Sequence, residues 1–165
     1  MPIRESTVND TDAIFALYQR VAEMPGGLLR LASEVRPAYV AGFLQKARLS
    51  GLSLVAEYDG RLVGEIHAHC PALYSLSHVW TELSIAVDPA TQGQGVGRML
   101  FTDFMARVRA RDDVHRVELI ARESNQRALR FYESLGFRQE GRFESRIRNV
   151  DGSVEADIPM AWLRD

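Results

Sequence analysis

Cysteine is nearly absent from this sequence of 165 residues, in which Cys70 is the single one. No disulfide can form within the chain, and no histidine and cysteine cluster has the spacing of a zinc site. The N-terminal segment 1–5 lacks the apolar run of a signal peptide, and no stretch approaches the length of a membrane span. The formal net charge of −2 shows no basic excess. We therefore expect a cytoplasmic protein with no metal, no membrane partner and no nucleic-acid partner.

The composition is that of an ordinary globular protein, with 46% hydrophobic and 25% charged residues. Hydrophobic periodicity predicts a single α+β domain over residues 1–165, with about four helices and a mixed, mostly antiparallel sheet of about seven strands. Pro159 is unusual within the last strand, because proline cannot donate to a sheet ladder, so we expect a bulge or an edge there. The predicted helices cover 8–24, 33–50, 96–108 and 125–135, and the predicted strands cover 2–6, 52–58, 61–69, 78–87, 114–121, 137–148 and 154–163.

A glycine-rich turn joins the predicted strand 78–87 to the helix that follows it. Its sequence is Asp88-Pro-Ala-Thr-Gln-Gly-Gln-Gly-Val-Gly-Arg98. Glycines let a backbone approach a ligand closely, and the first turn of a helix offers unpaired N–H groups and a positive dipole end. Together they suit a diphosphate, although a glycine-rich turn without any ligand is the plain alternative.

The spacing within this turn excludes two familiar phosphate loops. A Walker A loop needs Lys and Ser or Thr after its last glycine, and a Rossmann fingerprint would need a glycine where Arg98 stands. The pattern present is Gln92-x-x-Gly95-x-Gly97, which resembles the acetyl-coenzyme A loop of the GNAT superfamily of N-acetyltransferases. A second segment, from Asn125 to Phe137, is similar to the second cofactor motif of that superfamily.

The resemblance implies a fold in which the strands 78–87 and 114–121 are parallel neighbours that splay apart, leaving a gap for the pantetheine arm of acetyl-coenzyme A. Backbone groups of the first strand would pair with that arm, and the glycine-rich turn with Arg98 would hold the diphosphate. Asn125 would bond the arm and Phe131 would pack beside it, although they could equally be a helix-start residue and a core residue. The implied cofactor residues are Ile85, Ala86, Val87, Gln92, Gly93, Gln94, Gly95, Val96, Gly97, Arg98, Asn125 and Phe131.

Amide formation from a thioester needs a proton acceptor and a proton donor. Freeing the lone pair of a lysine-like amine at pH 7 costs about 4.6 kcal/mol, so a base or a desolvating site must offset that cost. Glu82 is the candidate base, because glutamate is disfavoured within strands and the resemblance implies an acid near this position. Tyr132 is the candidate acid that reprotonates the thiolate. A paired carboxylate and a half-buried helix tyrosine are the structural alternatives.

The acceptor site has a weaker signature in the sequence. Arg30 suits a carboxylate and Glu34 an ammonium, and His67 and His78 lie in or beside strands that border the implied site. Solvated charges and hydrogen-bonded histidines explain them equally well.

The resulting hypothesis is acetyl transfer from acetyl-coenzyme A to a primary amine of a small molecule, such as an amino acid or an amine-bearing antibiotic. The alternatives are acetylation of a protein N-terminus or lysine, and a non-catalytic module that binds acetyl-coenzyme A. A homodimer is left open.

Overall fold

The structure is a computed structural model that describes all residues 1–165 and contains eight strands and four α-helices. The sheet has the order β1-β2-β3-β4-β5-β8-β6, and β7 also pairs with β8. All strand pairs are antiparallel except β4 with β5. The elements are β1 (Ile3–Glu5), α1 (Thr11–Ala22), α2 (Pro37–Ser50), β2 (Gly51–Tyr58), β3 (Arg61–His69), β4 (Val79–Val87), α3 (Val96–Arg109), β5 (Arg116–Arg122), α4 (Gln126–Ser134), β6 (Arg138–Gln139), β7 (Phe143–Arg148) and β8 (Val154–Leu163).

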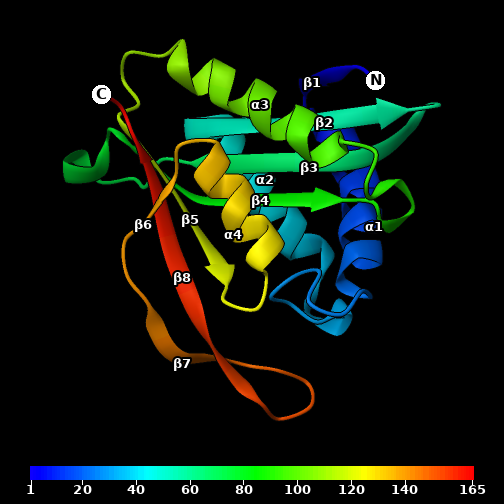
Figure 1. The fold of residues 1–165 in the computed structure, drawn as a ribbon. Coiled ribbons are helices and arrows are strands. Elements are labelled where there is room, and N and C mark those ends of the chain that lie inside the picture. Colours follow the sequence, from blue (N-terminus) through cyan, green and yellow to red (C-terminus); the bar gives the residue numbers. More distant parts are fainter.

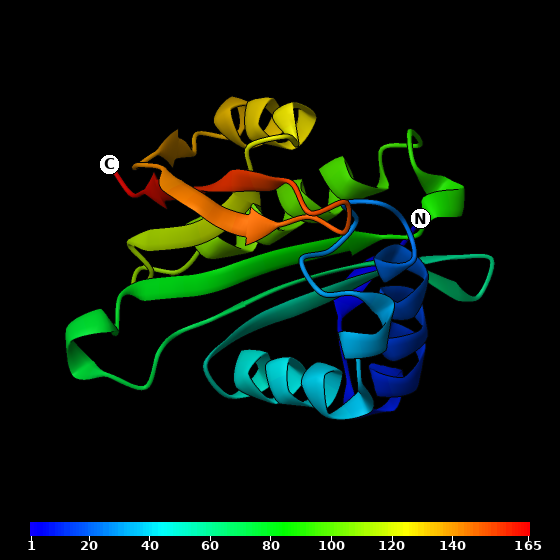
Figure 2. The same cartoon turned by 90° about the horizontal axis from the view of Figure 1, so that it is seen from below.

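The helices cover the two faces of the sheet unequally. In Figure 1, α3 and α4 lie in front of the sheet, and in the turned view of Figure 2 they lie on the side opposite α1 and α2. One apolar cluster joins α3 and α4 to the sheet, around Leu100, Phe101 and Phe104. A second cluster joins α1 and α2 to β2, β3 and β4, around Leu17 and Leu44. The β5–β8 half therefore has helical cover on one face only.

The sheet divides between β4 and β5, where the expected splaying is confirmed. Only Val79 with Arg116 and Trp80 with Val117 are paired between these parallel strands. Beyond Trp80 the edge of β4 that faces β5 has no strand neighbour, so its backbone groups remain open to a ligand.

A β-bulge in β4 begins immediately after the paired segment. His67 lies opposite Ser84, and His69 lies opposite Thr81, so two residues of β4 oppose one residue of β3. Glu82 occupies the bulge with a φ of 54°, a conformation that costs a non-glycine residue on the order of 1 to 3 kcal/mol. The bulge brings both Trp80 and Leu83 into the cluster beneath α3, although strict alternation would place them on opposite faces.

The predicted α+β class and the four helices are confirmed, and three details differ. The expected strand 137–148 is divided into β6 and β7 around Gly141, whose φ of 156° no other residue adopts readily, and this gives eight strands. The helix α2 begins at Pro37 because a short 3₁₀ turn occupies 32–34. Pro159 lies in an interior strand, where it pairs with Ile120 of β5. On its other side β6 has ended and β7 has not begun, so neither strand pairs with Pro159 there. None of the four α-helices combines the length and apolar composition that crossing a bilayer requires.

Candidate active site

The glycine-rich turn before α3 presents a row of free backbone donors. The N–H groups of Gln92 and Gln94 bond back into the turn, to Pro89 and Thr91. The remaining backbone N–H groups of the turn and of the first helical residues donate to no backbone carbonyl. These free donors belong to Gly93, Gly95, Val96, Gly97 and Arg98. Such a row at the positive end of a helix dipole is an anion site.

Two glycines shape this row of donors. Gly93 and Gly95 have φ values of 81° and 82°, and a Cβ atom at either would meet no heavy atom within 4 Å. The space above them is open to a ligand, and their backbone conformation is one that side chains disfavour. Gly97 lies in the first turn of α3, above Ile85 and Val87.

Asp88 anchors the start of the turn. Its buried carboxylate accepts the N–H of Ala90 at 3.0 Å and pairs with Arg20 at 3.0 Å and Arg61 at 3.3 Å. These contacts tie the turn to α1 and to the β2–β3 hairpin, so they fix the position of the free donors.

A cavity of about 630 Å³ occupies the gap between β4 and β5. The splayed strands supply Leu83 and Ile85 on one side and Leu119–Arg122 on the other. Its far end is closed by residues 26–30 of the α1–α2 loop and by the β7–β8 hairpin, which approach each other in Figure 2. Arg122 links the two by donating to Leu28 O at 3.3 Å and to Asn149 Oδ1 at 2.7 Å.

The helix α4 forms a wall of this cavity. Tyr132 lines it, and its ring packs on Phe101 at a centroid distance of 5.4 Å. Burial alone, with no contributing hydrogen bond, raises the pKa of Tyr132 to about 12, so its phenol is protonated at neutral pH. Phe131 lies under the Arg98 guanidinium at 5.2 Å. Asn125 lines the cavity while its Oδ1 caps α4 by accepting the Ala128 N–H at 3.1 Å.

Glu82 projects into the cavity from the bulge, and its side chain is 67% exposed. Its Oε2 lies 3.7 Å from Nε2 of His69, a buried histidine whose pKa is lowered chiefly by burial. Because His69 is therefore neutral at pH 7, the Glu82 carboxylate has no full cationic partner within the chain. An exposed, unpaired carboxylate beside an open strand edge is suited to hold an ammonium or to accept a proton.

A buried polar network lies beneath the same end of the cavity. Glu65 is fully buried and accepts hydrogen bonds from Tyr18 Oη and Ser53 Oγ, both at 2.7 Å. Nδ1 of His67 lies 3.0 Å and 3.2 Å from the two Glu65 oxygens. The His67 ring stacks on Phe43 at a centroid distance of 3.9 Å and an interplanar angle of 7°.

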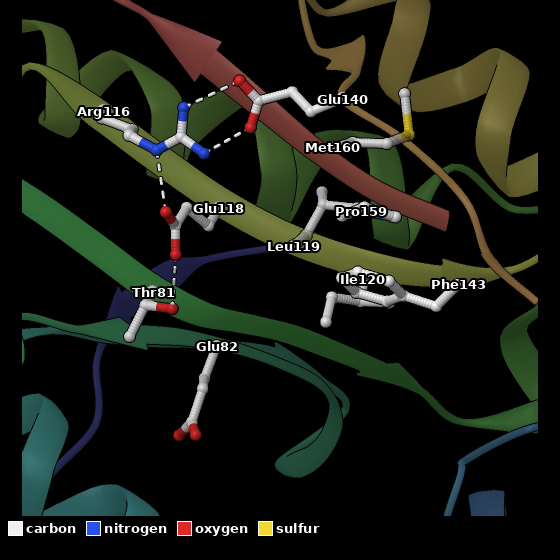
Figure 3. A pocket seen from close by; sticks show the side chains of 10 residues that line it. All are labelled: Thr81, Glu82, Arg116, Glu118, Leu119, Ile120, Glu140, Phe143, Pro159 and Met160. Carbon is white, nitrogen blue, oxygen red and sulfur yellow. Dashed lines mark hydrogen bonds and ion pairs between the residues drawn. The ribbon is translucent and has the colours of Figure 1, made fainter. Parts of the chain in front are cut away.

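A second pocket of about 400 Å³ shares Glu82, Leu119 and Ile120 with the main cavity. Figure 3 shows that Glu82 points away from the charged network that lines the rest of this pocket. In that network Arg116 pairs with both Glu118 and Glu140, and Thr81 Oγ1 donates to Glu118 at 2.8 Å. The charged groups of this network pair with one another, so Glu82 is the charged residue of the pocket that has no partner in the network.

The structure brings together six of the eighteen site residues that the sequence singles out. Glu82, Tyr132, Asn125, Ile85, Arg30 and His67 all line the main cavity. Two acceptor candidates do not line it. Glu34 accepts the Leu31 N–H at 2.9 Å and so caps a short turn, and His78 is exposed in the loop before β4, edge-on to His115.

Sequence reasoning missed the acid of β8. Asp157 lines the cavity, is 6% exposed, and has a raised pKa, chiefly because burial disfavours its charge. Arg146 lies 3.7 Å from it and also lines the cavity. An aspartate between the apolar residues Ala156 and Ile158 of a strand was the available signal.

Residues 16–137 match the family model described as Acetyltransferase (GNAT) family. The chain belongs to this family. The matched range ends at Phe137 and contains the splayed strands, the glycine-rich turn and α4.

Curated relatives of this GNAT chain differ in what they acetylate. A mycothiol acetyltransferase of Thermomonospora curvata is 40% identical over 92 residues, which are 53% of this chain and 28% of that protein. A [ribosomal protein bS18]-alanine N-acetyltransferase of Haemophilus ducreyi is 36% identical over 81 residues, which are 49% of this chain and 55% of that protein. The chain thus spans about a quarter of the first of these two relatives and about half of the second.

Solved GNAT structures share the fold at low identity. A ribosomal-protein-alanine N-acetyltransferase from Brucella melitensis superposes with a TM-score of 0.86 at 23% identity, covering 99% of this chain and 100% of that one. A phosphinothricin acetyltransferase from Sinorhizobium meliloti in complex with AcCoA gives 0.85 at 16% identity, covering 98% and 87%.

Proposed function

We propose that this GNAT chain is an N-acetyltransferase that moves an acetyl group from acetyl-coenzyme A to a primary amine of a small molecule, such as an amino acid or an amine-bearing antibiotic. The observation that carries the proposal is a single cavity that joins an open strand edge, a protonated phenol and an unpaired carboxylate. Family membership and the mycothiol relative support acetyl transfer to a small molecule.

The co-substrate end fits acetyl-coenzyme A. The five free N–H groups before and within α3 would hold the diphosphate, with Arg98 beside them. The open edge of β4 at Ile85–Val87 would pair with the pantetheine amides, and Asn125 and Phe131 would border the arm from α4. The bound thioester supplies an electrophilic carbonyl carbon and a thiolate leaving group.

The acceptor end would act through Glu82 and Tyr132. The Glu82 carboxylate attracts the ammonium of the acceptor and accepts a proton from its nitrogen in the course of acetyl transfer. The Tyr132 hydroxyl donates its proton to the departing thiolate, and its high pKa keeps that proton available at neutral pH. Both groups line one cavity, which favours an enzyme over a non-catalytic binding module.

Acetylation of a protein N-terminus is the second candidate. It is favoured by the second pocket, which shares Glu82 with the main cavity and is bordered by exposed Ile120 and Phe143 on the sheet face without helices. A peptide could follow that face and bring its terminal amine to Glu82. The loop and hairpin that close the main cavity favour the smaller acceptor.

A thermal-shift measurement with acetyl-coenzyme A, followed by thiol-release assays, tests the proposal. The co-substrate should raise the melting temperature by mass action, and coenzyme A should be released with at least one of the free amino acids, aminoglycosides or polyamines in a panel. Release only with peptides that have a free N-terminus would favour the second candidate. Stabilisation without release from any acceptor would support the binding module.

A further inference from the structure

The proposed reaction, on which this inference rests, removes two protons from one nitrogen. An ammonium must lose the first before its lone pair can attack the thioester carbon. The second leaves after the C–N bond has formed, as the C–S bond breaks. One of the two protons replaces the proton that Tyr132 donates to the thiolate, and the other is released to solvent. The acceptor end therefore needs two proton acceptors, or one that is used twice.

His67 has the geometry of an oriented base. Its Nδ1 faces Glu65, whose oxygens already accept hydrogen bonds from Tyr18 and Ser53, so the carboxylate is fixed in place and accepts a hydrogen bond from Nδ1–H. The stack on Phe43 sets the plane of the imidazole. With the proton on Nδ1, Nε2 carries the lone pair.

The lone pair of His67 opens into the cavity. All hydrogen bonds of the ring use Nδ1. Only two fully buried side-chain polar atoms lack a partner, and they belong to Ser6 and His69. Nε2 of His67 also has no partner but is not one of those two atoms, so it is not fully buried. Since the ring lines the cavity, we infer that Nε2 is accessible from there.

We propose that Nε2 of His67 accepts the first proton from the acceptor ammonium, that Glu65 is a positioning residue for this base, and that Glu82 accepts the second proton. A free imidazole, with a pKa of about 6.5, is roughly a hundredfold stronger a base than a free glutamate, with about 4.3. The nitrogen loses a proton twice, first as the free ammonium and then in the tetrahedral adduct. The free ammonium is the weaker acid of the two, so its deprotonation needs the stronger base. The nitrogen of the tetrahedral adduct is more acidic, and a carboxylate suffices for it.

The surroundings of His67 contain charged and titratable groups of both signs. Tyr18, Tyr39, Lys46, Glu65, His69 and Glu82 face it from α1, α2, β3 and β4, and Arg30, Arg146 and Asp157 line the cavity beyond.

The test compares His67→Gln with Phe43→Leu, which keeps the imidazole and removes its stacking partner. The value of kcat/KM for the best acceptor of the amine panel is measured from about pH 6 to about pH 9. We expect wild type and Phe43→Leu to share an acidic limb, and His67→Gln to lose about a hundredfold at pH 7 and much less at pH 9. A purely structural histidine predicts equal losses in the two variants with the acidic limb retained, which would overturn the proposal.

Glu65→Gln tests the positioning role. It keeps hydrogen-bonding capacity but removes the charge that holds the proton on Nδ1, so kcat should fall about tenfold while the KM for the acceptor changes little. An unchanged kcat, with melting temperature as a check on folding, would remove Glu65 from the mechanism.

A spectroscopic measurement on the wild-type protein covers the case in which the variants do not fold. The ¹⁵N shifts of His67 report the tautomer directly, and we expect Nδ1 protonated and Nε2 bare at pH 8. A proton on Nε2 at that pH overturns the inference. If wild type releases no coenzyme A with any amine, the proposed function fails first; if wild type turns over and the His67→Gln profile keeps its shape, only this inference fails.

Discussion

The two ends of the candidate active site are built in different ways. The co-substrate end consists of backbone groups from one continuous segment, Val79–Arg98, in which a strand, a glycine-rich turn and a helix start follow one another. The acceptor end consists of side chains from segments far apart in the sequence, including His67 of β3, Glu82 of β4, Arg122 of β5 and Asp157 of β8. A backbone site recognises one common donor, whereas a site of side chains can change its acceptor by substitution.

The largest expected effect tests whether the co-substrate end acts through its backbone alone. Gly95→Glu would place a charged side chain where the free N–H groups now meet open space, and it would repel phosphate. We expect the stabilisation by acetyl-coenzyme A to be lost entirely. Gly152→Glu is the matched control, because Gly152 also has a positive φ of 85° and open space but lies in the β7–β8 turn. Equal ligand-induced shifts in both variants would refute the assigned turn.

The next effect concerns Tyr132, which stands where the two ends meet. Tyr132→Phe keeps the ring that packs on Phe101 and removes the proton. We expect kcat to fall by about a hundredfold, with little change in the affinity for acetyl-coenzyme A. The raised pKa means that the phenol titrates only near pH 12, so the loss should be constant from pH 6 to pH 9. A preserved kcat would mean that water or another group reprotonates the thiolate.

The contrast between the two ends explains what the sequence could predict. The turn Gln92–Arg98 and the segment Asn125–Phe137 are local motifs, so their residues reveal both fold and co-substrate. The acceptor network joins Tyr18 to Glu65 across 47 positions, and periodicity carries no information about such a contact. The division of 137–148 into two strands depends on one glycine conformation, and the closing contact of Arg122 with Leu28 depends on tertiary packing. These features required the folded chain.

Glu82 gives a smaller, pH-dependent effect at the acceptor end. Glu82→Gln keeps the side-chain size and removes the proton acceptor, so turnover should fall about tenfold at pH 7 and less at pH 9, where the nitrogen of the tetrahedral adduct loses its proton to solvent more readily. The bulge is a backbone feature, so the melting temperature should change little. A rate ratio that stays flat from pH 7 to pH 9 would make Glu82 a binding residue only.

Asp157 gives the smallest change in rate and the clearest distinction between stability and function. Its pKa is raised by burial, so the folded protein binds its proton more tightly than the unfolded chain does. Stability therefore falls as pH rises through the window between the unfolded and folded pKa values, and above that window the ionised form is a constant cost.

Asp157→Asn removes that cost at pH 7, and we expect a melting temperature that is unchanged or up to about 3 °C higher. If the carboxylate attracts the acceptor ammonium beside Arg146, the same variant should raise the KM for the acceptor by about five- to tenfold and leave kcat and the affinity for acetyl-coenzyme A unaltered. Glu155→Gln is the control, because Glu155 is the neighbouring acid of β8 and its pKa is lowered by Asn149 and Ser124. That variant should lose stability and keep its KM, since Glu155 does not line the cavity. A lower melting temperature for Asp157→Asn with an unchanged KM would make Asp157 a structural partner of Arg146 and would move acceptor recognition to Glu82 alone.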